Sequence, residues 1–154
     1  MPGESYSDAI GERRIQGGEV ELTGSVTEQW DIIAGYTYME TDVDRGDVPA
    51  TFMLMPRHTV NLWTQYGFAG GMLDGVHLGG GVTAMSDFET TAVHAPGYAV
   101  FDAMLGYDFT SQLKGQLNFN NIFDREYYTR VGSTGTFNMV GEPANVVASL
   151  RYDF

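Results

Sequence analysis

The sequence predicts an all-β fold: an antiparallel, up-and-down transmembrane β-barrel segment of about seven strands. Three observations lead to it: an apolar–polar alternation with a period of two, connections that are alternately short and long, and an unusual composition. Glycine accounts for 20 of the 154 residues, aromatic residues for 13%, and charged residues for only 18% against a usual value of about 25%. No run of about 18 apolar residues is present, so the sequence contains no candidate transmembrane helix.

Seven segments alternate between apolar and polar residues, which is the period of a strand whose two faces meet different surroundings. In the clearest segment, Phe101, Leu105 and Phe109 share one face, while Asp102 and Asp108 lie on the other. Helical spacing fits none of the seven well. The expected strands are Ile15–Val26, Trp30–Tyr38, His58–Phe68, Val76–Ala84, Tyr98–Phe109, Lys114–Phe119 and Asn145–Phe154.

The connections between these segments differ in length. Outer-membrane barrels have short periplasmic turns at one end of the strands and long extracellular loops at the other. The long connections here are polar and rich in Gly, Asp, Thr and Pro, as such loops are. The short connections are Thr27–Gln29, Ala69–Gly75 and Thr110–Leu113, and the long ones are Met39–Pro56, Ser86–Pro96 and Arg125–Ala144.

A soluble β-sandwich is an alternative, because its strands also alternate. The outward residues of a sandwich are usually charged and include Lys, whereas the polar alternates here are mostly Asn, Gln, Ser, Thr and Gly. The apolar alternates end in aromatic residues near the strand ends, where a membrane interface would place them. The pattern therefore favours the barrel and leaves the sandwich open. These aromatic residues are Trp30, Phe68, Tyr107, Phe109, Tyr152 and Phe154.

The charge balance excludes several classes of function. Eight basic against 20 acidic residues give a net charge of −12, which argues against nucleic-acid binding and against a polybasic lipid-binding patch. The sequence has no cysteine, so disulfide scaffolds, thiolate metal sites and cysteine nucleophiles are excluded. No nucleophile–base–acid arrangement is visible, and we expect no enzyme. Residues 1–8 are polar and acidic, so we expect no signal peptide there.

The last third of the chain carries the most specific motifs: Asn118–Tyr128 (NFNNIFDREYY), Gly141–Pro143 (GEP) and Ser149–Phe154 (SLRYDF). They resemble the C-terminal end of a TonB-dependent outer-membrane receptor of the ferric-siderophore class. In that family the penultimate strand ends in N-[LI]-F-D-x-x-Y-Y, a G-x-P-R-x element opens the last strand, and the chain stops at an aromatic residue. Two departures, Ala144 in place of Arg and Met139-Val140 in place of common aromatic residues, bear on the ligand more than on the fold.

Earlier segments agree with this resemblance. Gly11–Glu21 (GERRIQGGEVE), Trp30–Tyr38 (WDIIAGYTY), Pro56–Tyr66 (PRHTVNLWTQY) and Tyr98–Tyr107 (YAVFDAMLGY) are similar to strands of the same family. The matches occur in order and at family spacing. The resemblance therefore covers about residues 11–154.

The resemblance implies the C-terminal part of a barrel, with 1–10 as a preceding loop and 11–154 as strands. Such receptors have a barrel of 22 strands around an N-terminal plug domain, which is absent here. It implies an outer-membrane location, a ferric siderophore as the transported ligand with no resident cofactor, and contacts with outer-membrane lipid and the insertion machinery. The TonB complex would act only through the missing plug.

Seven strands leave two unpaired edges, which cannot stand in hydrocarbon. We therefore expect the isolated chain to transport nothing. An alternative is a complete eight-stranded barrel acting as an adhesin, an anchor or a small pore, because its length is about that of this chain.

One long loop contains candidate ligand-binding residues, Tyr127, Tyr128, Arg130 and Phe137. Aromatic and Arg side chains suit a planar, anionic iron chelate through stacking and charge pairing. The alternative is that both tyrosines belong to the girdle of aromatic residues at the membrane interface.

The final residues carry a second candidate function. Phe154, with Tyr152 and Leu150 on the same face, resembles the assembly signal that the outer-membrane insertion machinery recognises. A girdle residue facing lipid is the alternative, and the two roles are compatible. Asp102 is expected on the lumenal face, because a carboxylate facing lipid near the midplane would cost a few kcal/mol.

No metal site is expected. Asp42–Asp47 is similar to the start of a calcium-binding loop, but Met53 stands at the twelfth position, where that loop needs Glu. We interpret the segment as an exposed acidic turn.

Overall fold

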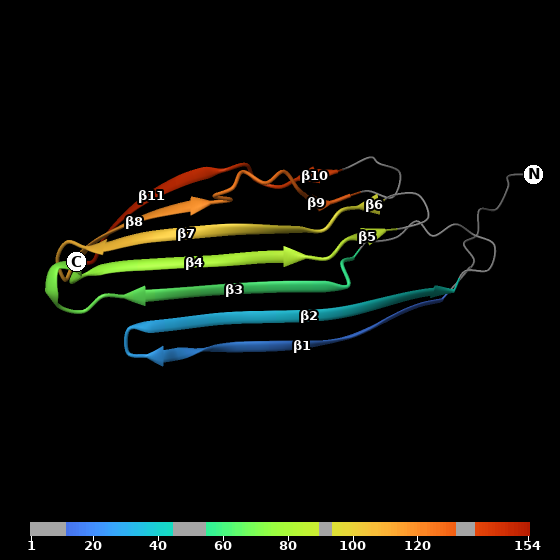
Figure 1. Ribbon diagram of the computed structural model, residues 1–154, viewed down its shortest axis with the longest axis horizontal. Coiled ribbons are helices and arrows are strands. Elements are labelled where there is room, and N and C mark those ends of the chain that lie inside the picture. Colours follow the sequence, from blue (N-terminus) through green and yellow to red (C-terminus); the bar gives the residue numbers. More distant parts are fainter. Residues whose placement is uncertain (1–11, 45–54, 90–93, 132–137) are drawn as a thin grey trace, which may run out of the picture.

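The computed structural model describes residues 12–44, 55–89, 94–131 and 138–154. They form one antiparallel sheet of seven strands in the order β1-β2-β3-β4-β7-β8-β11, so that each main strand pairs with the one next to it along the chain (Figure 1). This is the up-and-down arrangement that the sequence predicts. The strands are β1 (Glu12–Thr27), β2 (Trp30–Asp44), β3 (His58–Gly67), β4 (Val76–Met85), β7 (Tyr98–Asp108), β8 (Leu113–Asn120) and β11 (Asn145–Tyr152).

Shorter elements lie in the connections. Two ladders of two strands each, β5–β6 and β9–β10, occupy segments predicted as loops, and one 3-10 turn lies between β3 and β4. The sequence does not reveal these ladders because two or three residues are too few to show an alternation. Across the described ranges, no helix is long and apolar enough to cross a membrane. The short elements are β5 (Phe88–Glu89), β6 (His94–Ala95), β9 (Tyr128–Arg130), β10 (Met139–Val140) and η1 (Gly71–Leu73).

Several predicted strand ends need correction: β1 begins at Glu12 and not at Ile15, and β11 ends at Tyr152 and not at Phe154. β2 continues to Asp44 instead of ending at Tyr38, because its polar second half pairs with the start of β1, where Glu12 lies opposite Asp44. The strands β3 and β7 end one residue before Phe68 and Phe109, the first residues of their turns.

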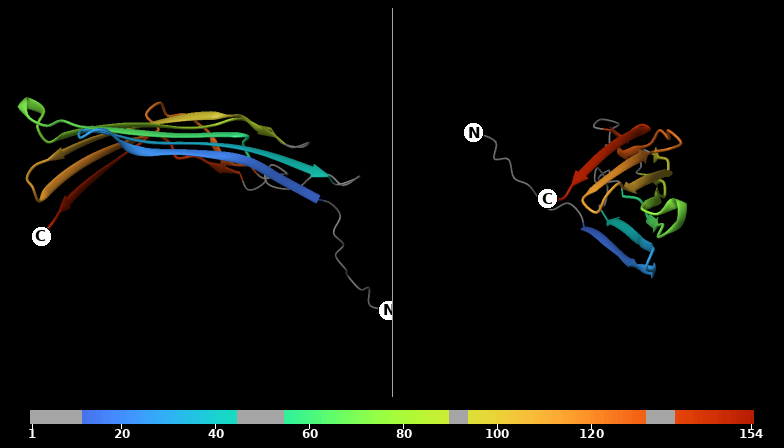
Figure 2. Two further views of the ribbon diagram at one scale, coloured as in Figure 1. Left: turned by 90° about the horizontal axis from the view of Figure 1, so that it is seen from below. Right: turned by 90° about the vertical axis from the view of Figure 1, so that its left-hand side faces the viewer.

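The sheet is curved, with a concave and a convex side (Figure 2). Neighbouring rows of paired residues have opposite character. One row runs Glu21–Gly35–Asn61–Thr83–Val100 and is largely polar. The next row runs Leu22–Ala34–Leu62–Val82–Phe101 and is entirely apolar. Because successive side chains point to opposite faces, each row belongs to one side of the wall.

The apolar side of this sheet is exposed. Val20 is 67% and Leu150 71% exposed, whereas the buried apolar residues of the described ranges are a small group on β7 and in the connection between β4 and β7. A sandwich would bury its apolar faces between two layers, and the sheet here is a single layer. The soluble β-sandwich alternative is therefore wrong, and lipid is the solvent that suits the convex side. The buried group consists of Phe88, Ala95, Tyr98, Val100 and Met104.

Aromatic residues gather at the end that carries the short turns. Edge-to-face pairs join Tyr66 to Phe68 at 4.9 Å, Tyr107 to Phe109 at 5.0 Å and Tyr152 to Phe154 at 5.1 Å between ring centroids. The indole nitrogen of Trp30 donates a hydrogen bond to Thr64 Oγ1 at 2.6 Å, so its polar atom is also satisfied. This is the arrangement of an interfacial aromatic girdle.

Within the described part of the chain, β1 and β11 each pair with one neighbour only. They form the two edges of the sheet (Figure 1). The backbone groups along both edges need partners from another strand before the wall can stand in a membrane.

Candidate functional site

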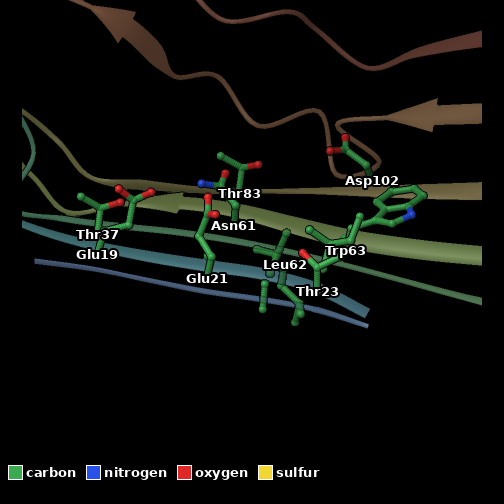
Figure 3. Close-up of a pocket in the computed structure, with 14 residues that line it drawn as sticks. Glu19, Glu21, Thr23, Thr37, Asn61, Leu62, Trp63, Thr83 and Asp102 are labelled. Carbon is green, nitrogen blue, oxygen red and sulfur yellow. The ribbon is translucent and has the colours of Figure 1, made fainter. Parts of the chain in front are cut away.

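The concave side contains a hollow of about 290 Å³ that crosses five strands. Its polar side chains rise from the same side of the sheet, among them Glu19 and Glu21 of β1, Asn61 of β3, Thr83 of β4 and Asp102 of β7 (Figure 3). None of the described residues that line it is Lys or Arg. Three carboxylates without a cation make this surface electronegative.

One aromatic residue lies flat on the floor of this hollow. A Cβ added to Gly81 would lie 2.5 Å from Cε3 of Trp63, and one added to Gly79 would lie 2.9 Å from Cζ2 of the same ring. The indole therefore covers two alternate glycines of β4 directly, and Met104 approaches Gly79 beside it. Because these two residues have no side chain, the large indole ring can lie directly against β4 and takes up less of the lumen.

A second hollow of about 350 Å³ lies at the end that carries the long connections. It is lined by Tyr98 and Asp102 of β7 and by Asn120 at the end of β8. Tyr127 of the connection after β8 and Glu142 near the start of β11 also line it. Its walls thus come from three segments distant in sequence. We call this hollow the rim cavity.

A buried asparagine holds these segments together. Asn121 is 2% exposed and has a left-handed φ of 49°. Its backbone N–H donates to Asp102 Oδ1 at 2.8 Å, and its Nδ2 donates to the carbonyl oxygens of Arg125 at 2.9 Å and of Glu142 at 3.0 Å. Its Oδ1 accepts from the backbone N–H of Arg125 at 2.8 Å. Through its backbone N–H and its side chain, this one residue ties β7, the turn after β8 and the last connection together.

Further polar contacts fix the last connection to the same turn. The backbone N–H of Ala144 donates to Asp124 Oδ1 at 2.9 Å, and Asn120 Nδ2 donates to Asn145 Oδ1 at 2.8 Å. The Asn-Asn-Ile-Phe-Asp motif and the Gly-Glu-Pro motif are therefore two halves of one structure. We call it the Asn121 node, comprising Asn120, Asn121, Asp124 and their hydrogen-bond partners.

Tyr127 lies on the rim cavity. Its ring packs against Tyr98 with 4.4 Å between centroids, and its carbonyl accepts the backbone N–H of Gly141 at 2.8 Å. A Cβ on Gly141 would overlap Cζ of Tyr127, so this ring needs a glycine beneath it. The ring of Tyr127 therefore faces the lumen, which is not the place of a lipid-facing girdle residue.

The other predicted ligand-binding residues lie elsewhere. Tyr128 and Arg130 belong to β9, where both are exposed, with Tyr128 opposite Val140 and Arg130 opposite Met139. Neither lines the rim cavity. Phe137 lies outside the described residues, so the structure does not place the four together.

The candidate assembly residues lie on one exposed face. Leu150, Tyr152 and Phe154 are 71%, 52% and 109% exposed, and they alternate along β11 and its last residues. This face is the convex one, since Leu150 continues the row of Gly115 and Tyr107.

Sequence reasoning missed the residues that organise the rim. Asn121 and Tyr98 were not singled out, although an Asn pair directly after a strand is a signal for a left-handed turn residue. Glu142 and Trp63 could be placed only from the pairing of strands. Among the described residues, no group of three His, Asp or Glu residues is suited to a metal ion. Of the predicted acidic turn Asp42–Asp47, Asp42–Asp44 form the end of β2, and Arg45–Asp47 lie outside the described residues, as does Met53.

The profile described as "TonB dependent receptor-like, beta-barrel" matches residues 2–122. The chain belongs to this family. The structural match supports the same assignment, and the TonB-dependent receptor chain is located in the cell outer membrane.

Two relatives of the TonB-dependent receptor chain illustrate the similarity in sequence. The ferric-pyoverdine M114 receptor PbuA of Pseudomonas sp. (strain M114) is 36% identical over 97% of this chain and 19% of its own length. The catecholate siderophore receptor Fiu of Escherichia coli (strain K12) is 30% identical over 97% of this chain and 21% of its own length. The chain thus spans about a fifth of the length of the curated relatives it matches.

Solved structures give the same result. The crystal structure of Fiu from E. coli K12 in its closed form superposes with a TM-score of 0.79 at 29% identity, over 94% of this chain and 21% of that one. The P. aeruginosa receptor FpvA bound to a heterologous pyoverdine gives 0.77 at 30% identity, over 94% and 20%. The expected family and fold class are confirmed.

Proposed function

We propose that the chain forms the C-terminal part of the barrel of an outer-membrane active transporter, which binds a ferric siderophore and imports it with energy from TonB. In this proposal, residues 11–154 are wall strands and the plug lies in a different part of the receptor. The observation that carries the proposal is the pairing of a lipid-suited convex face with a polar concave face that ends in a tyrosine-lined cavity. Relatives that are receptors for ferric pyoverdine and catecholate siderophores support it.

The rim cavity is the proposed contact with the ligand. Tyr98 and Tyr127 present aromatic faces and hydroxyl groups beside each other, which suits the flat, oxygen-rich surface of an iron chelate. Arg130 is exposed on β9 and would supply the cation for an anionic ligand. Tyr128 and Phe137 are proposed as further contacts from the same connection.

The remaining partners follow from the same proposal. Outer-membrane lipid covers the convex face, the insertion machinery reads Phe154 with Tyr152 and Leu150, and TonB acts through the plug. The relatives are transport receptors, and the proposal contains no enzymatic step.

The test is an uptake assay in the organism that carries the gene. Deletion of the gene should abolish uptake of iron-55 supplied as ferric pyoverdine or as a ferric catecholate, and the natural-length gene should restore it. Tyr127→Ala should weaken binding of the same ligand about tenfold, which corresponds to about 1.4 kcal/mol. Unchanged uptake of both ligands in the deletion strain would contradict the proposal.

Two further variants separate the rim cavity from a general defect. Gly141→Ala keeps the Tyr127 hydroxyl but displaces its ring, and should weaken binding in the same direction. Tyr107→Ala removes a tyrosine that is 43% exposed on the convex face at the turn end, and should leave binding unchanged. Equal losses in all three variants would exclude the rim cavity as the binding site.

A further inference from the structure

The connection between β3 and β4 differs from the other short turns in its chemistry. It contains η1 (Gly71–Leu73), whose Met72 is 100% exposed and whose Leu73 is 48% exposed. The two other short turns, Thr27–Gln29 and Thr110–Gln112, carry only polar residues at their tips. The β3–β4 turn is therefore the short turn with an apolar tip.

This tip is held in a defined conformation. The backbone N–H of Gly70 donates to Asp74 Oδ1 at 2.8 Å, and that of Gly75 donates to the carbonyl of Phe68 at 3.2 Å. Gly70, Gly71 and Gly75 all have left-handed φ values, between 72° and 81°. The single carboxylate of the tip is thus turned back onto the turn, and the two apolar side chains are left outside.

The turn points toward the convex side. In both views of Figure 2 its green ribbon curls away from the hollow of the sheet, at the end where the other short turns lie. Its base is Phe68, whose ring packs edge to face on Tyr66 of the aromatic girdle. The apolar tip is therefore continuous with the lipid-facing surface.

We propose that Met72 and Leu73 insert into the periplasmic leaflet of the outer membrane and anchor this turn at the boundary between headgroups and acyl chains. Exposed apolar side chains beside aromatic girdle residues suit this layer, which accepts both apolar and polar groups. The occupant is phospholipid, because the periplasmic end of the wall meets that leaflet. The inference depends on the outer-membrane placement of the sheet and not on the ligand that the receptor transports.

The test uses site-directed spin labels on the natural-length protein in isolated outer membranes. The 154 residues contain no cysteine, so Met72→Cys and Leu73→Cys each introduce one labelling site into this chain. Ser111→Cys, in the polar turn between β7 and β8, is the matched control at the same end. The ratio of collision rates with oxygen, which dissolves in lipid, and with a water-soluble nickel chelate should be several-fold higher at 72 and 73 than at 111.

Two results would overturn the inference. Nickel-chelate access at 72 and 73 equal to that at 111 would mean that the tip lies in water. A periplasmic protein would cover the tip if the label at position 72 had low access to both reagents and if access to both rose after peripheral proteins were stripped from the membranes. Met72→Trp gives a second readout, since the fluorescence of the introduced indole should be quenched by brominated phospholipid after reconstitution.

Discussion

The two ends of the sheet are held by different kinds of interaction. At the turn end, aromatic pairs such as Tyr107–Phe109 lie on the outer face and need only lipid around them. At the loop end, the Asn121 node joins three segments through directional hydrogen bonds in a buried position. The turn end therefore depends on residue class, whereas the loop end depends on particular residues.

The largest effect is expected at the Asn121 node. Asn121→Ala removes three side-chain hydrogen bonds and leaves the backbone groups of Arg125 and Glu142 without these partners, which should lower the free energy of unfolding by about 3 kcal/mol. Urea titration of the natural-length protein, read by the mobility of the folded form on unheated gels, measures it. Asn121→Gly also removes the side chain, but glycine adopts the left-handed φ without strain. This variant therefore measures the loss of the side chain without added backbone strain.

The control for this variant is Asn118→Ala. Asn118 lies on β8, three residues before Asn121, and its side chain accepts one hydrogen bond, from Gln116 Nε2 at 2.7 Å. Equal urea midpoints for Asn121→Ala and Asn118→Ala would show that the loop end does not depend on the node.

An intermediate effect is expected in the middle of the wall, where adjacent glycines differ. In Gly81→Ala the new Cβ meets Trp63 at 2.5 Å and the carbonyl oxygen of Leu62 at 2.7 Å, which should cost about 2 kcal/mol and shift the tryptophan fluorescence. In Gly80→Ala the nearest atom is Asp102 O at 3.7 Å, and we expect a change within about 0.5 kcal/mol. Similar stabilities for the two variants would contradict the observed placement of Trp63.

The smallest effect is expected at the turn end. Phe109→Leu keeps an apolar residue but removes the edge-to-face contact with Tyr107, and should cost about 1 kcal/mol in the same urea titration. Phe123→Leu at the loop end is the matched variant, since its ring meets Phe101 at 5.5 Å and is 72% exposed. A loss at Phe109 as large as that at Asn121 would remove the distinction between the two ends.

The sequence predicts the wall well because membrane and lumen impose a period of two on each strand. The prediction fails for the outer part of β2, where Glu40 follows Tyr36 and Tyr38 on their face and the alternation of the apolar stretch ends. It also fails for contacts that join distant segments. The bond from Asn121 to the carbonyl of Glu142 spans 21 residues, and the placement of Trp63 on Gly81 requires the register of two strands.

The candidate site was predictable in part. Tyr127 was singled out by its residue type in a long connection, and its ring does lie on the rim cavity. The sequence does not predict its neighbour Tyr98 as a site residue, because Tyr98 lies at the start of a different strand. Tyr98 and Tyr127 meet only through the pairing of β7 with β8. Residue type identifies chemistry, but strand pairing decides which groups share a cavity.

The Asn121 node also has a consequence for the order in which the wall assembles. Asn120 and Asn145, which bond to each other, are 25 residues apart, and closing a flexible loop of that length costs on the order of 3 kcal/mol in chain entropy. The last strand can gain its hydrogen bonds to β8 only after that cost is met. The node closes the loop at its base, so it makes the final hairpin a single cooperative unit that forms late.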